Sequence, residues 1–150
     1  MKFLADAMLG RLARWLRFAG VDCAYERDRQ DEAFLRHAAD EKRIILTRDK
    51  KLAAKASGPA YVVGSDHCRD QLRDIFTSFT LHQGDILTRC GDCNAVLAPI
   101  SSADAFGRIP LHVSSSCHEL KMCPSCSKIY WRGAHVDSIE CTLRKILKEM

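Results

Sequence analysis

The chain has 150 residues, of which 47% are apolar and 28% are charged, and its formal net charge is +4. These proportions are ordinary for a globular protein and exclude both a disordered tail and a membrane protein. No apolar run approaches the roughly 18 residues of a spanning helix, and Asp6 interrupts the N-terminus before a signal-peptide core can form. The sequence therefore predicts a cytoplasmic protein with no membrane partner, and its mild positive charge permits an anionic partner without requiring one.

The first 80 residues alternate between short apolar runs and amphipathic helical spacing. The apolar runs predict strands at residues 2–5, 21–25, 43–47 and 61–63. Apolar residues at helical spacing predict helices over residues 8–19, 28–39, 49–56 and 66–79. Strands that alternate with helices in this way predict an α/β fold whose mostly parallel sheet is joined by right-handed crossovers.

The pattern changes around residues 82–88. Beyond it the sequence has paired cysteines, short apolar pieces and a serine-rich stretch at 100–116 that we expect to be a loop. Helical spacing resumes over 138–150. We therefore predict two domains, an α/β domain over 1–85 and a small second domain with a C-terminal helix over 86–150.

Aspartates stand at or just beyond the ends of the predicted strands. Asp6 ends the first strand, Asp31 follows the second with Asp28 nearby, Asp49 ends the third and Asp66 follows the fourth. If the strand order is 2-1-3-4, Asp6 and Asp49 face one crevice and Asp31 can reach it from the side. Converging carboxylates repel one another unless a cation such as Mg²⁺ or Mn²⁺ neutralises them, and such an ion can activate water for phosphodiester hydrolysis. Helix capping alone is the alternative for Asp28, Asp31 and Asp49.

Basic residues accompany these acids. Arg11, Arg14 and Arg17 recur at i+3 on the first predicted helix, and Lys50 and Lys51 follow Asp49 directly. Basic residues around an acidic site suit a polyanion such as RNA, because the cations would attract its phosphates. A solvated helix face is the alternative explanation.

The cysteines indicate a metal site. The chain has eight cysteines, and four of them form the pairs Cys90/Cys93 and Cys123/Cys126. Four thiolates in two Cys-x-x-Cys pairs are typical of a structural zinc site, with Cys117, His118 and His135 as possible substitute ligands. A redox motif is less well supported, because strand-like residues follow Cys126 where a redox pair would begin a helix. Tyr130 and Trp131 in that stretch can form the small domain's core or stack on unpaired bases.

Several blocks of the sequence resemble the Mut-seven C-terminal ribonuclease family, a branch of the PIN-like nucleases. The blocks are Phe3-Leu4-Ala5-Asp6, Met8 to Arg17, Asp31 to Leu35 and Ile44 to Asp49, and the segments Cys90 to Asn94 and Cys123 to His135 resemble the zinc ribbon that follows in this family. The resemblance implies a short PIN-like parallel sheet flanked by helices, followed by a C-terminal zinc ribbon with structural zinc. It further implies a Mg²⁺- or Mn²⁺-dependent ribonuclease with Asp6, Asp31 and Asp49 as catalytic metal ligands.

For this activity we expect single-stranded RNA as the partner, with Arg11, Arg14, Arg17 and Lys50 contacting it. PIN domains often have a further acid shortly after the Thr-x-Asp block, and Leu52-Ala53-Ala54 supplies none here, so Asp66 is the candidate replacement. Two alternatives therefore remain. One is a non-catalytic nucleic-acid-binding protein with a degenerate PIN-like domain, and the other is a thiol or zinc redox sensor.

Overall fold

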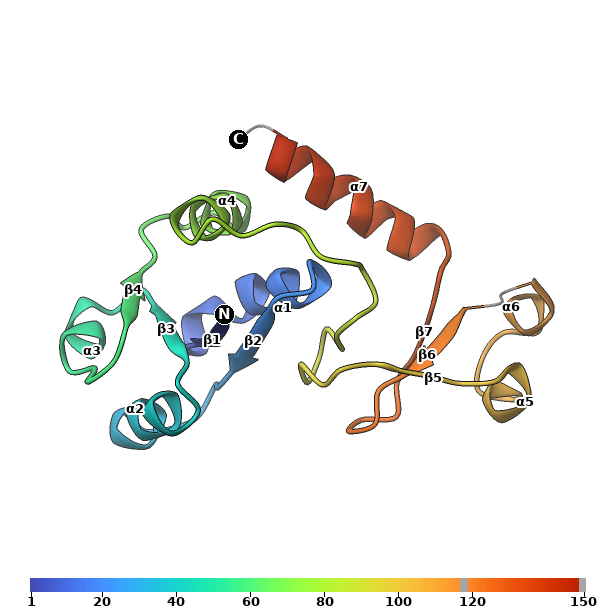
Figure 1. The fold of residues 1–150 in the computed structure, drawn as a ribbon, viewed down its shortest axis with the longest axis horizontal. Coiled ribbons are helices and arrows are strands. Elements are labelled where there is room, and N and C mark those ends of the chain that lie inside the picture. Colours follow the sequence, from blue (N-terminus) through green and yellow to red (C-terminus); the bar gives the residue numbers. More distant parts are fainter. Residues whose placement is uncertain (117–118, 149–150) are drawn as a thin grey trace.

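The computed structural model describes residues 1–116 and 119–148, and its first half is built on one parallel sheet. The strands are β1 (Lys2–Ala5), β2 (Asp22–Tyr25), β3 (Ile44–Thr47) and β4 (Ala60–Val62), in the order β2-β1-β3-β4. The predicted α/β class is confirmed (Figure 1). The order puts β1 and β3 side by side, which brings the carboxyl ends of these two strands to the same edge of the sheet.

Helices cover both faces of this sheet. They are the 3₁₀ turn η1 (Ala7–Leu9), α1 (Gly10–Phe18), α2 (Asp31–Asp40), α3 (Lys50–Ala54) and α4 (Cys68–Ser78). α2 begins at Asp31, later than the expected Asp28, and α4 begins at Cys68, later than Asp66. Asp28 and Asp66 therefore lie in the connections before these helices.

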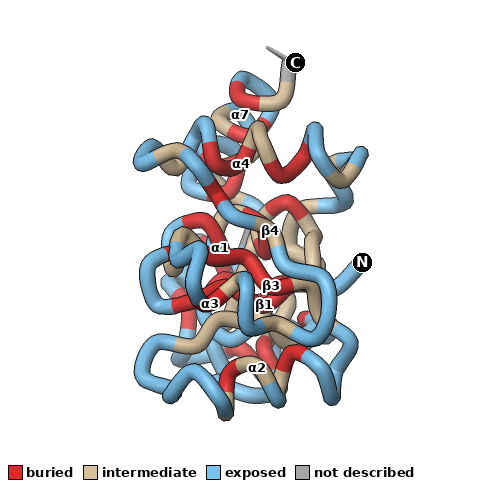
Figure 2. The backbone as a smooth tube through the Cα atoms, turned by 90° about the vertical axis from the view of Figure 1, so that its left-hand side faces the viewer, coloured by how far each residue is buried: buried red, intermediate tan, exposed pale blue. Residues whose placement is uncertain are grey.

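The two faces of the sheet bury separate sets of apolar side chains. One set joins β1 and β3 to α1 and α4 and includes Phe3, Leu12, Leu16, Leu72 and Phe76. The other joins the same strands to α2 and α3 and consists of Leu4, Phe34, Ala38, Ile45 and Leu52. Since side chains alternate along a strand, consecutive residues such as Phe3 and Leu4 enter opposite layers. The buried residues run through the middle of the molecule in Figure 2, with exposed turns around them.

The second half contains a small antiparallel sheet. Its strands are β5 (Ala98–Pro99), β6 (Leu120–Met122) and β7 (Ile129–Trp131), in that order. The stretch expected to be a loop instead includes two short helices, α5 (Ser102–Ala105) and α6 (Leu111–Ser116). Ala105, Ile109 and Val113 pack with Leu120, so this half has a small core of its own.

The C-terminal helix α7 (Ala134–Lys148) returns to the first half of the chain. It lies beside α4, and its residues Ile139, Leu143 and Ile146 belong to the same core as Phe3 and Leu12 (Figure 1). α7, which we predicted as the C-terminal helix of the second domain, therefore packs on the α/β part of the molecule. The boundary near residue 85 remains a prediction.

Length and composition argue against a membrane span within the described part of the chain. None of its helices combines the length and apolar character needed to cross a bilayer. α7 has 15 residues, fewer than the approximately 20 of a spanning helix, and it carries several charges.

Candidate functional site

Asp6 occupies the carboxyl end of β1 and is held by hydrogen bonds on each of its side-chain oxygens. Its backbone N–H donates to the Leu46 carbonyl at 3.1 Å, which continues the pairing of β1 with β3. Oδ1 accepts from the Met8 N–H at 3.0 Å and caps η1, while Oδ2 accepts from the hydroxyl of Thr47. With only 8% of its surface exposed, Asp6 is a nearly buried carboxyl group in a fixed position.

Thr47 connects Asp6 to Asp49. Its side chain is fully buried, and its Oγ1 both donates to Asp6 and accepts from the Asp49 N–H at 2.9 Å. The exposed Asp49 is the N-cap of α3, since its Oδ1 accepts from the N–H groups of Lys51 at 2.7 Å and Leu52 at 3.2 Å. Asp49 is therefore a helix cap whose backbone N–H is linked to the Asp6 carboxylate through the Thr47 hydroxyl.

Asp31 and Asp66 each form an ion pair with a basic side chain. Asp31 is the first residue of α2, its side chain is 58% exposed, and it pairs with Lys55 at 3.2 Å. Asp66 pairs with Arg48. Within residues 1–116 and 119–148, the four cysteines are the only group of three or more possible metal ligands whose ligand atoms lie close enough to share an ion. The acids thus line one edge of the sheet without forming a closed ligand set.

Glu26 is an acid at this edge that the sequence analysis did not select. It directly follows β2, and its N–H donates to the Ala5 carbonyl at 3.2 Å, so it continues the register that pairs Ala5 with Tyr25. By strand alternation it shares a sheet face with Asp6 and Thr47. The sequence signal was available, because Glu26 follows the second strand as Asp6 follows the first.

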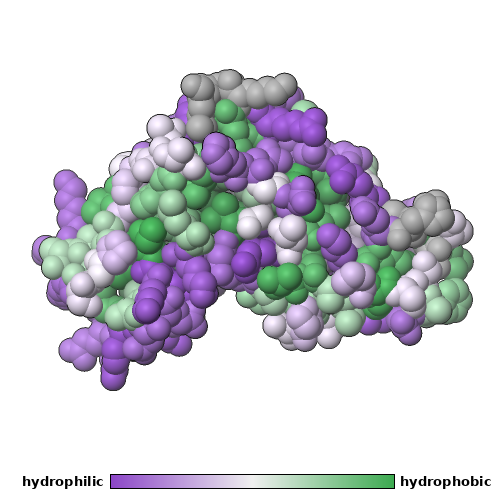
Figure 3. Space-filling view, viewed as in Figure 1, coloured by the Kyte–Doolittle hydropathy of each residue, from purple (hydrophilic) through white to green (hydrophobic). Residues whose placement is uncertain are grey.

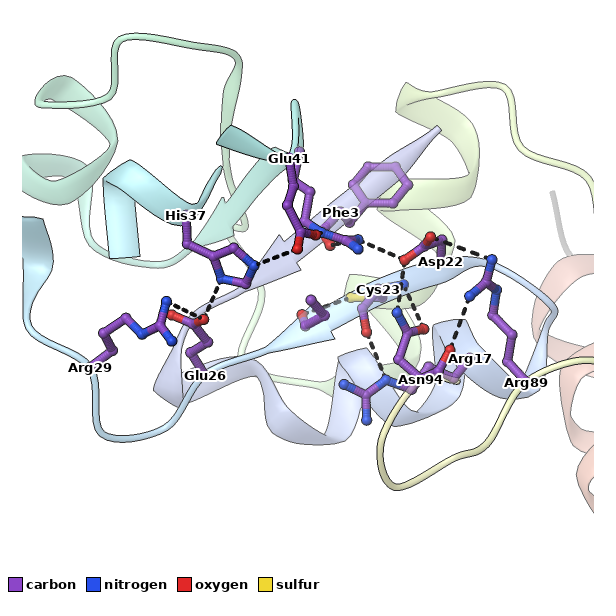
Figure 4. Close-up of polar contacts among 12 residues, drawn as sticks. Phe3, Arg17, Asp22, Cys23, Glu26, Arg29, His37, Glu41, Arg89 and Asn94 are labelled. Carbon is purple, nitrogen blue, oxygen red and sulfur yellow. Dashed lines mark hydrogen bonds and ion pairs between the residues drawn. The ribbon is translucent and has the colours of Figure 1, made fainter. Parts of the chain in front are cut away.

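Only one of the two carboxylate oxygens of Glu26 has a polar partner among the described residues. Its Oε1 pairs with Arg29 at 3.0 Å and with Nδ1 of His37 from α2, and His37 Nε2 faces Glu41 at 3.2 Å (Figure 4). Its Oε2 is buried and has no hydrogen-bond partner among the described residues. A buried carboxylate oxygen without a donor is costly, and a bound cation or an ordered water would remove that cost.

The second candidate centre is the group of four cysteines. The Sγ atoms of Cys90, Cys93, Cys123 and Cys126 lie within 4.8 Å of one another, with Cys90 and Cys126 separated by 3.7 Å and Cys93 and Cys123 by 3.1 Å. Zn–S bonds of about 2.3 Å in a tetrahedron separate neighbouring sulfurs by about 3.8 Å, so the group has the dimensions of a structural zinc site. The predicted metal-binding cluster is confirmed.

The surroundings of Cys90 favour its thiolate. Burial alone would raise its pKa, but hydrogen bonding by the Tyr130 hydroxyl, at 3.1 Å, and by the backbone N–H groups of Cys93 and Asp92 lowers it to about 6. A cysteine must lose its proton to bind a metal, and Cys90 does so more readily than Cys93, whose pKa burial raises to about 12. Of the proposed substitutes, His135 is exposed and outside the group, while Cys117 and His118 lie outside the described residues.

Arg17 has a different role from the one predicted. It is 5% exposed, and its guanidinium donates to the carbonyls of Cys23 at 2.7 Å, Gly91 at 3.1 Å and Asp92 at 2.8 Å. Two of these carbonyls belong to the turn after Cys90. Arg17 therefore attaches the first cysteine pair to α1 and β2, and this burial leaves it no surface for a phosphate.

Asn94 makes a second attachment between the cysteine turn and β2. Its Oδ1 accepts from the Cys23 N–H at 3.1 Å, and its Nδ2 donates to Asp22 at 2.8 Å (Figure 4). Asp22 also binds Arg43 at 2.6 Å and Arg89 at 3.4 Å. Burial would raise the pKa of Asp22, but the hydrogen bonds from Arg43 and Asn94 outweigh it and lower the pKa.

Close contact at Gly91 completes this interface. A Cβ atom at Gly91 would lie 2.6 Å from the ring of Phe18 on α1, so no other residue fits without moving that ring. The turn after Cys90 is thus packed against the α/β part of the molecule.

The other predicted basic residues remain at the surface. Arg11 and Lys50 are exposed. The Arg14 side chain is 53% exposed, lies 5.6 Å from the centre of the Phe18 ring and pairs loosely with Asp92 at 3.4 Å. In the space-filling view, hydrophilic side chains also gather over α2 and the segment before it, near the acidic edge (Figure 3). Arg11, Arg14 and Lys50 are therefore accessible to a large anionic ligand.

Comparisons with known proteins give one match. Among curated proteins and among solved structures, nothing matches the chain. The family model described as the Mut7-C RNAse domain matches residues 1–143. Since that match covers nearly the whole sequence, the resemblance noted above is confirmed, and the chain belongs to the Mut7-C RNAse domain family.

Proposed function

We propose that this protein is a metal-dependent ribonuclease that hydrolyses phosphodiester bonds of single-stranded RNA at the carboxyl edge of its parallel sheet. The observation that carries the proposal is the chain of hydrogen bonds from Asp6 through Thr47 to Asp49. It links the Asp6 carboxylate to the backbone of Asp49 at the carboxyl ends of two adjacent strands, which is the position where ligands bind in open α/β sheets. Membership in a ribonuclease family supports the same chemistry.

The residues at this edge fit a hard divalent cation such as Mg²⁺ or Mn²⁺, which prefers carboxylate oxygens. Asp6 and Asp49 would hold it. Asp31 would assist from α2 once its ion pair with Lys55 is broken. The buried Oε2 of Glu26, next to Asp6 in the sheet, supplies an oxygen that lacks a donor. When bound, the ion supplies an activated water and stabilises charge on the scissile phosphate.

The protein's own groups position the reactants. Thr47 fixes the orientation of Asp6, and the capping hydrogen bonds of α3 fix Asp49. Arg11, Arg14 and Lys50 would bind phosphates on either side of the scissile bond, as cations do along single strands. The four cysteines would hold a structural zinc ion, and the zinc ribbon would extend the RNA-binding surface.

A non-catalytic RNA-binding protein is the second candidate. The observation that favours it is the pairing of Asp31 with Lys55, together with the lack of a closed group of three acids in the described part of the chain. A protein of this kind would bind RNA through the same cations and leave the strand intact.

The test is cleavage of an end-labelled single-stranded RNA by the zinc-loaded protein, with added Mn²⁺ or with Mn²⁺ omitted. We expect Mn²⁺-dependent cleavage that Asp6→Asn and Asp49→Asn each reduce by at least about a hundredfold, since each removes a metal ligand. Asp40→Asn, at the exposed C-terminal end of α2, is the matched control and should cleave at the wild-type rate. RNA binding by the wild type without cleavage would favour the second candidate.

A further inference from the structure

A groove lies between the α/β part of the molecule and the small antiparallel sheet. It has a volume of about 230 Å³, and its walls come from α1, the connection at residues 86–87, β7 and the start of α7. This is below the approximately 300–1,000 Å³ of pockets that take drug-sized ligands. Its size therefore suits a single planar ring system.

Aromatic side chains form much of this groove. Phe18 contributes from α1, and Tyr130 and Trp131 contribute from β7. Tyr130 and Trp131 are each half-buried, because they pack on the cores of the small sheet and the cysteine group while their remaining surface lines the groove. Gly133 also lines the groove, beside Trp131. An indole with an accessible surface is a stacking platform for any nucleobase.

Two cationic side chains lie at the groove. Arg14 and Lys128 both line it, with side chains 53% and 46% exposed. The carboxylate of Asp92 lies between them, at 2.7 Å from Lys128 and 3.4 Å from Arg14. Cationic side chains beside an aromatic surface complement a nucleotide's phosphate and base.

Helix α1 connects the acidic edge of the sheet to the groove. α1 starts at Gly10, directly after the turn that Asp6 caps, and carries Arg11 and Arg14 one turn apart before it reaches Phe18. At 1.5 Å per residue, the helix spans about 12 Å from Gly10 to Phe18. A strand held at the acidic edge can therefore follow the arginines of α1 and reach the groove within a few nucleotides.

We propose that this groove binds one unstacked base of single-stranded RNA, which stacks on Trp131 while an adjoining phosphate contacts Arg14 and Lys128. The identity of the ligand as RNA rests on the proposed function, which this inference deepens by assigning a base-binding subsite outside the acidic edge. The zinc ribbon then contributes a contact to substrate as well as structural support.

The experiment uses the tryptophan fluorescence of the zinc-loaded full chain. The chain has two tryptophans, so Trp15→Phe leaves Trp131 as the single reporter. This variant is titrated, without Mg²⁺ or Mn²⁺, with a short oligoadenylate and with an abasic oligonucleotide of equal length and charge. We expect saturable quenching by the oligoadenylate and at least about tenfold weaker quenching by the abasic strand, because stacking requires the base.

Variants in the otherwise unchanged chain test the contacts by anisotropy of a labelled oligoadenylate. Trp131→Ala should weaken affinity about tenfold, and Trp131→Phe should restore most of it, which separates stacking from a folding defect. Phe106→Ala, which alters an aromatic side chain 67% exposed in the small domain, is the matched control and should leave affinity unchanged. Lys128→Gln should make the slope of log affinity against log salt shallower by about 0.7.

The outcomes separate this inference from the proposed function. Equal quenching by the abasic strand would show an anion site and overturn base binding. Oligoadenylate binding with unchanged Trp131 fluorescence and unchanged affinity in Trp131→Ala would also overturn it, while Mn²⁺-dependent cleavage would still support the ribonuclease. Base-dependent quenching in a protein that cleaves no RNA would support the groove and contradict the ribonuclease.

Discussion

The Thr47 hydroxyl at the end of β3 donates a hydrogen bond to the carboxylate of Asp6 at the end of β1, and both residues are almost completely buried. The same oxygen accepts from the N–H of Asp49. One hydroxyl thus links the Asp6 carboxylate to the backbone of Asp49, which is 43 residues later in the sequence. At the ion site that we propose, such positioning would reduce the reorganisation needed on binding.

Replacement of this hydroxyl gives the first prediction. Thr47→Val keeps the side-chain shape but leaves Asp6 and the Asp49 N–H each short of a partner, so we expect a loss of about 1–3 kcal/mol in the free energy of unfolding. Affinity for Mn²⁺ should fall about 10- to 100-fold, as for other groups that orient metal ligands. Urea unfolding and calorimetric Mn²⁺ titration measure the two effects. Thr47→Ser should retain both properties, and a valine variant with wild-type Mn²⁺ affinity would contradict the positioning role.

The cysteine group predicts about one tightly bound zinc per chain, measurable by elemental analysis of protein purified without chelators. Cys126→Ser should lose the ion and loosen the turn at Cys90, which Arg17 and Asn94 attach to α1 and β2. Hydrogen exchange should then increase around residues 90–94 and 123–131. Cys141→Ser, on an exposed cysteine of α7 outside the group, should keep the zinc. Zinc-free wild-type protein would contradict the site.

We expect Arg17 and Arg11 of α1 to differ, with Arg17 contributing to stability and Arg11 to RNA binding. Arg17→Ala removes three hydrogen bonds to buried or partly buried carbonyls, so we expect a loss of about 3 kcal/mol or more in stability. Arg11→Ala, on the exposed face, should change stability by less than about 0.5 kcal/mol and make the salt slope of RNA binding shallower by about 0.7. Urea unfolding and salt-dependent binding distinguish these effects. An Arg17→Ala protein of wild-type stability would contradict the attachment.

Asp22 gives a prediction about pH. Its folded pKa is lowered, so its carboxylate stabilises the fold above the unfolded value of about 3.9, and this contribution disappears as the pH falls through the lower folded pKa. Asp22→Asn should therefore be less stable than wild type at pH 7, by about 1–3 kcal/mol, and the difference should shrink in acid. Urea unfolding of both proteins at pH 7 and pH 3 measures this. A difference that stays constant across this range would contradict the assignment.

The sequence predicted the parts of the fold that depend on local periodicity. Alternating apolar runs and amphipathic helices define the parallel sheet, and residues that follow such strands necessarily meet at one edge, which is why Asp6 and Asp49 were identified. The same reasoning applies to Glu26, which directly follows β2. Glu26 stands out because its buried Oε2 has no hydrogen-bond donor, and this burial depends on how α2 packs against the sheet.

Contacts between distant segments could not be read from the sequence. Arg11, Arg14 and Arg17 have the same spacing, and Arg17 is buried because a turn more than 70 residues later packs against it. The return of α7 to α4 depends likewise on how the small domain is placed. Helical periodicity identifies the apolar stripe of α7 but not the surface that it covers.

The central claim is that Asp6 and Asp49 hold a divalent ion at the edge of the sheet. Crystals of the zinc-loaded protein soaked in Mn²⁺, with anomalous data collected at the manganese edge, test it most directly. We predict an anomalous peak bound by carboxylate oxygens of both Asp6 and Asp49, distinct from the zinc at the four cysteines and missing in Asp6→Asn. Manganese bound elsewhere, or a wild-type edge without manganese at a concentration that supports RNA cleavage, would contradict it.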